Sequence, residues 1–262
     1  MARVRYAYAD GLAHITLTDA EHGNAVAPEL VSDLFAAVRS ATRDGARVIL
    51  LDAEGRFFSV GGNLAAFEAA VDMAAYIDDL ADALHRVVSE LQRSDAIVVT
   101  SVQGHAAGAG FPLAAAGDLV LAAETVRFSL GHNKVGLSVD GGSTLLTRTL
   151  GLHRTLRLAL LGDSLSAQEA HGAGLVTAVV ADHRLAGEVK EIVEKLLALP
   201  FQAQADTKRL IRENVSTEVE VALRGEALGI RANADSDDGR EGVAAFLEKR
   251  KPEFAHRGAN QQ

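Results

Sequence analysis

The stretch GHAAGAGFPLAAAGD at residues 104–118 indicates the fold class of this chain through what lies on either side of it. The segments Ala96–Val102 and Asp118–Ala123 are apolar, as buried strands are. Between them, a glycine-rich loop over 104–110 precedes a short apolar stretch that predicts a helix. A strand, a glycine-rich loop and a helix in this order predict one unit of a layered α/β fold.

The same unit occurs once before this stretch and once after it. Arg47–Ala53 predicts a strand buried on both faces, followed by GRFFSVGGN at 55–63 and a helical pattern from about Leu64 to Leu91. Val126–Phe128 predicts a strand before the loop 131–143 and helices through Leu161. The flanking sequence predicts a hairpin over 4–17, a helix from Pro28 ended by Gly45, a helix opened by a capping box of Ser166 and Glu169, and a last strand over Leu175–Val180.

The pattern changes from Arg184 onward. Apolar residues recur there with helical spacing, and no stretch is typical of a strand. We therefore predict an α/β core over residues 1–183 and a helical C-terminal region over 184–262. No low-complexity linker separates the two, so the second region is expected either as a docked extension or as a free domain.

Composition and charge exclude several functions. Hydrophobic residues make up 48% and charged residues 23% of the 262 residues, as in ordinary soluble globular proteins. The sequence has no cysteine, which excludes disulfides, thiolate nucleophiles and zinc ribbons, and no metal site is predicted. A net charge of −9 without a basic tract makes nucleic acids and anionic membranes poor partners. The N-terminus lacks an apolar signal segment and no apolar run is long enough to span a bilayer, so we expect a cytoplasmic protein.

The three glycine-rich loops, at 55–63, 104–110 and 135–144, are open to three interpretations. They could be tight turns alone. A dinucleotide phosphate cradle is disfavoured, because Leu113 stands where its fingerprint requires glycine and no P-loop motif is present. The third interpretation is an oxyanion hole, in which two such loops each aim a backbone N–H at one carbonyl oxygen.

Five segments together carry a resemblance to a known family. They are ITLTDAEHGNAV at 15–26, SVGGNL at 59–64, the stretch at 104–118, VGLSVDGGST at 135–144 and EGVAAFLEKRKPEF at 241–254. In order and spacing they resemble the crotonase, or enoyl-CoA hydratase/isomerase, superfamily over essentially the whole chain. The resemblance implies an α/β spiral of repeated ββα units with a C-terminal all-helical oligomerisation region, assembled as a homotrimer or a dimer of trimers. It also implies an acyl-CoA thioester substrate and no separate cofactor, because coenzyme A is part of the substrate.

The resemblance implies an oxyanion hole made by the N–H groups of Gly62 and Ala109. The family usually has an aspartate after the first of these positions, where this chain has Asn63. Hydratases of the family use two glutamates to activate water, and the matching positions here are Pro112 and His132. Neither carboxylate is present, so hydration by the two-glutamate mechanism is not expected.

One carboxylate remains in the third loop, at Asp140. It resembles the acid/base of 1,2-epoxyphenylacetyl-CoA isomerases and the nucleophile of 4-chlorobenzoyl-CoA dehalogenases. One carboxylate can remove a proton from an enoyl thioester and return it to another carbon, since the hole stabilises the enolate. The competing interpretations are a turn residue in an Asp-Gly pair and a helix cap.

The histidines are further candidates. His132 could relay a proton or bond a polar acyl group, or could simply be an exposed loop residue. His85 and His105 are weaker candidates, and His85 lines an acyl pocket only if the resemblance extends to the helical stretch that contains it.

For coenzyme A, the resemblance implies contacts of the adenine with Glu21, His22 and Gly23, and of the pantetheine with Val60 and Leu64. It also implies Phe246 and Lys249, the latter near the ribose phosphate, in the same or a neighbouring subunit. Residues 249–251 are the sole run of three basic residues, which suits a polyanionic ligand but also the solvated end of a helix.

These observations lead to a first functional hypothesis of double-bond isomerisation in an acyl-CoA through a thioester enolate, with Asp140 as acid/base. The alternatives are hydration of an enoyl-CoA by an unusual water-activating set such as His132 with Asp140, and a catalytically silent acyl-CoA-binding protein.

Overall fold

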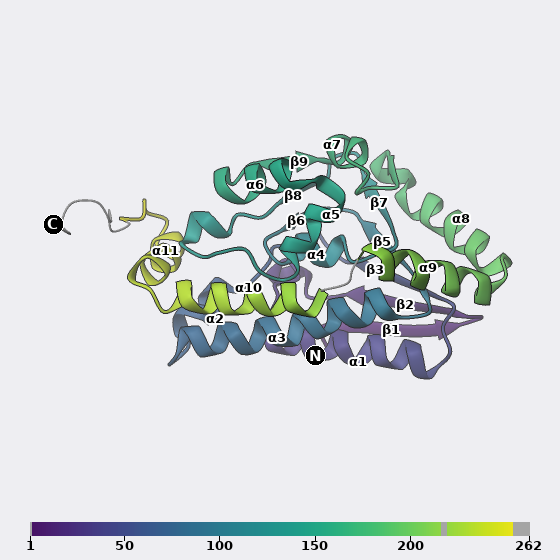
Figure 1. Cartoon of the computed structure of the whole chain (residues 1–262), viewed down its shortest axis with the longest axis horizontal. Coiled ribbons are helices and arrows are strands. Elements are labelled where there is room, and N and C mark those ends of the chain that lie inside the picture. The colour runs from purple at the N-terminus through teal and green to yellow at the C-terminus, as the bar shows by residue number, and fades with distance from the viewer. Residues whose placement is uncertain (1, 216–218, 254–262) are drawn as a thin grey trace.

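The computed structural model describes residues 2–215 and 219–253 (Figure 1). The strands form two sheets. The larger has the order β1-β2-β3-β5-β7-β10 and the smaller has the order β4-β6-β8-β9. The strands are β1 (Val4–Ala9), β2 (Leu12–Leu17), β3 (Val48–Ala53), β4 (Phe57–Ser59), β5 (Ile97–Val102), β6 (His105–Ala107), β7 (Leu119–Ala123), β8 (Arg127–Ser129), β9 (Ser164–Ser166) and β10 (Ala178–Val180).

The chain winds as a spiral because each turn adds one strand to each sheet. β3, β5 and β7 are successive parallel strands of the larger sheet, and the strand that follows each of them, β4, β6 or β8, joins the smaller sheet in parallel. A helix then returns the chain to the start of the next turn. In the first turn the helices are α2 (Leu64–Ala69) and α3 (Met73–Arg93), and in the second turn there is α4 (Gly110–Ala114). In the third turn they are η2 (His132–Val135), η3 (Ser143–Leu146), α5 (Thr147–Leu150) and α6 (Leu152–Leu161).

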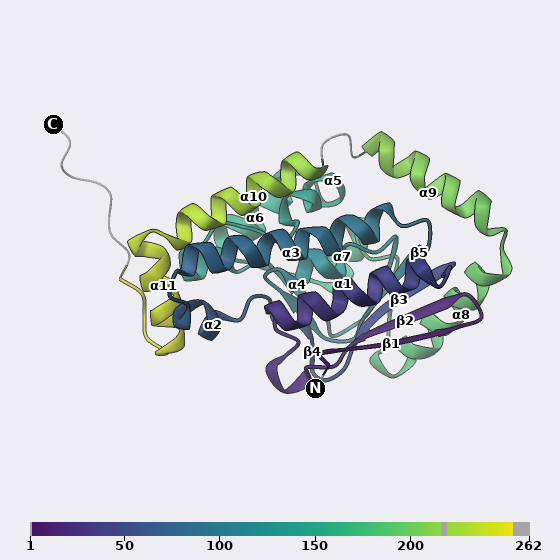
Figure 2. The same ribbon diagram turned by 90° about the horizontal axis from the view of Figure 1, so that it is seen from below.

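Helices cover both faces of the larger sheet. α1 (Pro28–Arg43) packs on β1 and β2, and Figure 2 shows it side by side with α3 and then α10 (Val219–Ala234). α8 (Leu185–Ala198) packs on β3, β5 and β7 from the opposite side (Figure 1). Because both faces are covered, β3 and β5 are almost wholly buried, as their continuous apolar sequences predict.

The strands end at Val180, and the described residues from 185 to 253 contain helices but no strand. These helices are α8, α9 (Phe201–Val215), α10 and α11 (Asp237–Leu247). α10 packs along α3, and α11 packs against α2 and η2. The division of the chain at residue 183 remains a prediction, and the helical residues that the structure describes lie on the α/β part as a docked extension would. No helix within the described ranges is both long and apolar enough to cross a membrane.

Two details differ from the sequence-based expectations. The helical pattern from Leu64 to Leu91 is two helices, because Asp72 accepts a hydrogen bond from the N–H of Ala75 and starts α3 anew. β4, β6 and β9 were not predicted, because strands of three residues are too short to display an alternating pattern. The remaining short elements are η1 (Ala20–His22), α7 (Ala167–Gly172), which has the predicted capping box, and η4 (Asp182–Arg184).

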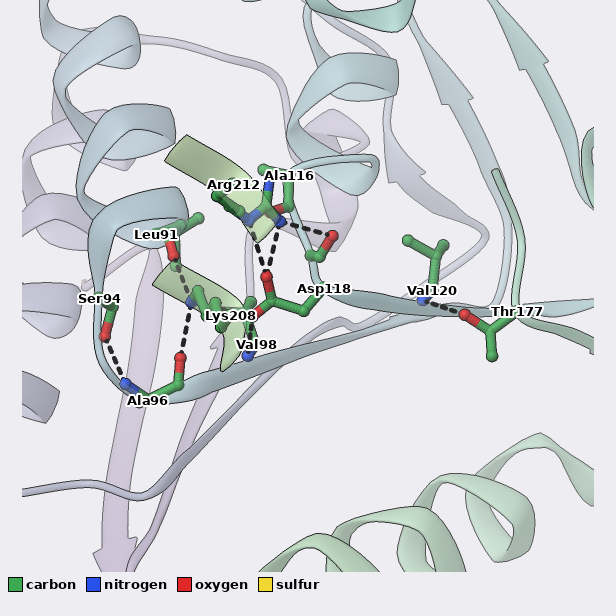
Figure 3. Close-up of polar contacts among 11 residues, drawn as sticks. Leu91, Ser94, Ala96, Val98, Ala116, Asp118, Val120, Thr177, Lys208 and Arg212 are labelled. Carbon is green, nitrogen blue, oxygen red and sulfur yellow. Dashed lines mark hydrogen bonds and ion pairs between the residues drawn. The ribbon is translucent and has the colours of Figure 1, made fainter. Parts of the chain in front are cut away.

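A buried ionic cluster attaches α9 to the core (Figure 3). Lys208 is 8% exposed, and its Nζ donates to the carbonyls of Leu91 and Ala96 at 3.1 and 2.8 Å and lies 2.9 Å from a carboxylate oxygen of Asp118. Arg212 bonds the other oxygen of Asp118 through two nitrogens. Burial lowers the pKa of Lys208, and the charge of Asp118 opposes this shift. These contacts give Asp118 a structural role.

The Lys208→Met variant is expected to lower the free energy of unfolding by about 3 kcal/mol. Removing one partner of a buried ion pair typically costs about 3–5 kcal/mol, and Arg212 still neutralises Asp118. Urea-induced unfolding followed by circular dichroism measures the change. The control is Lys190→Met on α8, whose exposed pair with Glu194 should contribute less than about 1 kcal/mol. Equal stability of the two variants would contradict a role for the cluster.

Candidate active site

Three loops from successive turns of the spiral meet at one cavity of about 270 Å³. The first follows β4, the second follows β6, and the third precedes η3. Helices α2 and α3 supply apolar side chains to the wall, and α10 and α11 each supply one. The predicted residues that line this cavity are Val60, Gly62, Leu64, Ala109, His132, Asp140 and Phe246.

Glycines allow the three loops to touch. Gly61 has a φ of +85°, and a Cβ there would lie 2.8 Å from the carbonyl oxygen of Ala107 and 3.3 Å from the nitrogen of Ala109. A Cβ on Gly141, whose φ is +72°, would lie 2.8 Å from the Cβ of Ala109. Any larger residue at either position would therefore separate the loops, so the glycines bring the backbone at 61–62, 108–109 and 140–141 together.

The local hydrogen bonds of the first two loops do not use the N–H groups predicted for the oxyanion hole. The parallel bridge between Val26 and Gly62 uses the N–H of Val26 and the N–H of Asn63. In the second loop, the N–H of Gly108 donates to Ser129, and Ala109 stands at the N-cap of α4. The N–H groups of Gly62 and Ala109 belong to loops in contact and take no part in these bonds.

Asp140 is buried, with 6% of its surface exposed, although it lies in a loop. Its carbonyl oxygen accepts hydrogen bonds from both the N–H and the hydroxyl of Ser143, so its backbone forms the turn that the Asp-Gly pair predicts. η3 has Gly142 as its N-cap and no side-chain cap, so the helix-cap interpretation of Asp140 is wrong. The carboxylate instead lines the cavity.

Two buried groups far away in the sequence lie beside Asp140. Nε2 of His85, on α3, is 2.9 Å from Oδ1 of Asp140 and 3.8 Å from Oε2 of Glu226, on α10. Glu226 is 4% exposed and accepts hydrogen bonds from the N–H of Gly142 at 2.7 Å, from the N–H of Thr144 at 2.6 Å and from the Thr144 hydroxyl. Burial and the charge of Asp140 raise the pKa of Glu226, and these hydrogen bonds oppose the shift. Glu226 thus holds the loop that carries Asp140.

Sequence reasoning ranked His85 low and missed Glu226. Glu226 belongs to no motif and lies in the helical region, 84 residues from the Gly142 that it binds. The available signal was an acidic residue at helical spacing between the apolar residues Leu223 and Ile230. His85, Asp140 and Glu226 are also a set that could hold a metal ion, since their ligand atoms lie within 4.8 Å of one another. Each oxygen of Glu226 already accepts hydrogen bonds, which favours a hydrogen-bonded network at this position.

His132 is half-buried in the cavity wall. Burial lowers its pKa below the ordinary value of 6.5, and the charge of Asp140 opposes that shift. A neutral imidazole is therefore expected at neutral pH, and it can accept or relay a proton. His105 is half-buried outside the cavity lining, 3.0 Å from the hydroxyl of Ser129, and burial and Arg127 lower its pKa.

Two of the three departures from the family pattern, at Pro112 and Asn63, have local structural explanations. Pro112 is buried inside α4 and does not line the cavity, so nothing titratable stands at the first hydratase position. Asn63 caps α2, since its Oδ1 accepts a hydrogen bond from the N–H of Ala66 at 3.2 Å. Asparagine and aspartate are equally good N-caps, so this change preserves the local structure.

The residues assigned to coenzyme A differ in their relation to the cavity. Val60, Leu64 and Phe246 line the cavity, and the carbonyl of Gly23 accepts a hydrogen bond from the N–H of Val60 at 3.0 Å. The remaining three are exposed and do not line the cavity: Glu21 and His22 in η1, and Lys249 after α11.

Some of the charged side chains at and beside these exposed residues already have partners of opposite charge. His22 lies 2.7 Å from Asp19. Arg250, in the basic run, pairs with Glu241 and Glu248, so its charge is largely neutralised locally.

Comparison with known proteins identifies the family. The chain matches the family described as enoyl-CoA hydratase/isomerase over residues 7–257. It is 35% identical to the 1,2-epoxyphenylacetyl-CoA isomerase of Escherichia coli K12 over 250 residues, which cover 93% of this chain and 95% of that protein. It is 31% identical to the 2,3-dehydroadipyl-CoA hydratase of the same organism over 235 residues, 89% of each chain.

Solved structures agree with the sequence comparison. The crystal structure of an enoyl-CoA hydratase from Mycobacterium avium subsp. paratuberculosis K-10 superposes with a TM-score of 0.88 at 32% identity, covering 97% of this chain and 99% of that one. The expected crotonase-like fold is thereby confirmed. From the matched residues and this fold, the chain belongs to the enoyl-CoA hydratase/isomerase family of the crotonase superfamily.

Proposed function

We propose that this enzyme isomerises an acyl-CoA thioester through an enolate, with Asp140 as the acid/base. The observation that carries the proposal is the composition of the cavity wall. Among the described residues that line it, Asp140 is the sole acidic side chain, while the two positions that hold glutamates in hydratases are Pro112 and His132. One carboxylate suffices for a proton shuttle but not for the two-glutamate activation of water.

The proposed reaction moves one proton between two carbons. The N–H groups of Gly62 and Ala109 donate to the thioester oxygen. The Asp140 carboxylate takes a proton from the α-carbon of a 3-enoyl thioester, and the electron pair of the broken C–H bond delocalises onto the thioester oxygen. Asp140 then delivers the same proton to the γ-carbon, and the double bond becomes conjugated with the carbonyl. Each oxyanion donor typically contributes about 2.7–4 kcal/mol to such a step.

Two alternatives remain distinct from this proposal. Hydration would need His132, with its lowered pKa, to accept a proton from water while Asp140 orients that water. A silent acyl-CoA-binding protein would use the cavity without proton transfer. The apolar wall supports acyl binding in all three cases, and the buried carboxylate supports the catalytic ones.

Supplying a 3-enoyl-CoA and crotonyl-CoA separately tests the three candidates, with absorbance of the conjugated thioester as the signal. Isomerisation raises this absorbance from 3-enoyl-CoA, whereas hydration lowers it from crotonyl-CoA. Incubation with a saturated acyl-CoA in deuterium oxide then reports exchange at the α-carbon. Hydration of crotonyl-CoA faster than isomerisation would contradict the proposal, and the lack of both turnover and exchange would favour the silent protein.

We also propose a homotrimer or a dimer of trimers. Large apolar side chains are exposed on α9 and α10 of the single chain, among them Leu210, Ile211 and Leu228. Exposed large apolar side chains of this kind favour contact with another copy. Light scattering coupled to size-exclusion chromatography is expected to give three or six times the chain mass of 27.5 kDa. A monomeric mass at micromolar concentration would contradict this expectation.

A further inference from the structure

His85 faces Asp140 from the buried side of α3. The imidazole is 6% exposed, and its Nε2 lies 2.9 Å from Oδ1 of Asp140. Neither atom makes an aligned hydrogen bond within the part of the chain that the structure describes. Buried polar atoms are nearly always hydrogen-bonded in folded proteins, because leaving them unpaired is unfavourable. The 2.9 Å between them is a hydrogen-bonding distance, so each atom is the candidate partner of the other.

The other acidic neighbour of His85 is already engaged. Oε2 of Glu226 is 3.8 Å from Nε2 of His85, and the Glu226 carboxylate accepts three hydrogen bonds from Gly142 and Thr144. These bonds hold Glu226 to the loop after Asp140. The acceptor nearest to His85 is therefore the Asp140 carboxylate.

The position of Asp140 explains why such a partner matters. Asp140 is the first residue of a turn whose two central residues are Gly141 and Gly142, and these glycines have no side chains that could support the carboxylate. Proton transfer to carbon requires the carboxylate oxygen at a defined distance from the substrate, and a displacement of 1 Å can lower the rate by about 10²-fold. An imidazole on a long helix is a rigid support for one of the two oxygens.

We propose that His85 is a positioning residue that donates from Nε2 to Oδ1 of Asp140, so that Oδ2 meets the hydrogen of the substrate. This inference rests on the function proposed above. Nε2 carries the hydrogen in this arrangement and keeps it through the reaction. Asp140 alone exchanges a proton with the substrate.

The variants His85→Leu and His85→Gln separate this role from simple packing. Leucine fills the site without a donor, and kcat is expected to fall by about 10- to 100-fold while KM changes less than about threefold. Glutamine retains an N–H donor near the position of Nε2, and kcat should recover to within about fivefold of the wild-type value. If His85→Leu does not fold, as judged by thermal unfolding, His85→Gln decides: a kcat below about a tenth of wild type would overturn the proposal.

A double-variant cycle tests whether His85 acts through Asp140. If it does, His85→Leu combined with Asp140→Asn should be no slower than Asp140→Asn alone, within about threefold. Multiplied losses would overturn the proposal, because His85 would then act independently. The matched control is His14→Leu, which removes another His–Asp contact, 2.7 Å to Asp52, in the larger sheet away from the cavity, and should leave kcat unchanged.

The kcat values of the Asp140 and His85 variants distinguish failure of the positioning role from failure of the proposed function. If Asp140→Asn is slow and His85→Leu retains wild-type kcat, the positioning role is wrong and the proposed function stands. If Asp140→Asn retains wild-type kcat, the proposed function is wrong, and the positioning role is wrong with it.

Discussion

Asp140→Asn is expected to lower kcat for isomerisation of a 3-enoyl-CoA by about 10²–10⁴-fold, the usual contribution of a general acid/base. The amide has nearly the same shape as the carboxylate but takes up no proton from carbon. Binding should change little, because the apolar wall and the residues proposed to contact coenzyme A are unchanged. Steady-state kinetics measures the first effect, and calorimetric titration with a saturated acyl-CoA measures the second.

The matched control for Asp140→Asn is Asp52→Asn. Asp52 also lies within contact distance of a histidine, His14, but in the larger sheet outside the cavity. Its substitution should leave kcat within about twofold of wild type. Wild-type turnover by Asp140→Asn would remove Asp140 from the chemistry. Loss of acyl-CoA binding along with turnover would instead assign it a binding role.

Ala109→Pro is expected to lower kcat by about 10²–10³-fold, because proline has no N–H and one donor of an oxyanion hole contributes that much. The backbone favours this substitution. Ala109 has a φ of −63°, which matches proline, and it stands at the N-cap of α4, where its carbonyl oxygen accepts a hydrogen bond from Leu113 but its N–H donates none to the helix. The N–H of Gly62 remains in place, so part of the stabilisation should persist.

Ala109→Gly is the control for the proline variant. It keeps the N–H and removes only the side-chain methyl group, so kcat should stay within about threefold of wild type. Retained binding of a saturated acyl-CoA by Ala109→Pro shows that the cavity is intact. A proline variant with intact binding and wild-type kcat would exclude the Ala109 N–H as an oxyanion donor.

Local sequence patterns predicted most of the α/β spiral. The alternation in β1 and β2, the apolar runs of β3, β5 and β7, and the capping box at Ser166 each depend on neighbouring residues alone, and each is present as expected. The break at Asp72 and the short strands β4, β6 and β9 were missed. A helix cap can interrupt a continuous helical pattern. A three-residue strand forms because it pairs with the strands beside it, which its own sequence does not show.

The residues of the candidate site also divide into those that local motifs reveal and those that only the fold brings together. The sequence by itself determined the family, the three glycine loops and the isolated carboxylate at Asp140, because these reside in contiguous motifs whose backbone geometry depends on glycine. Only the tertiary structure brought His85 and Glu226 to that carboxylate. Their positions follow from the packing of α10 on α3, and such packing depends on whole helix faces, so a buried polar residue on either helix reveals its partner only when the helices meet.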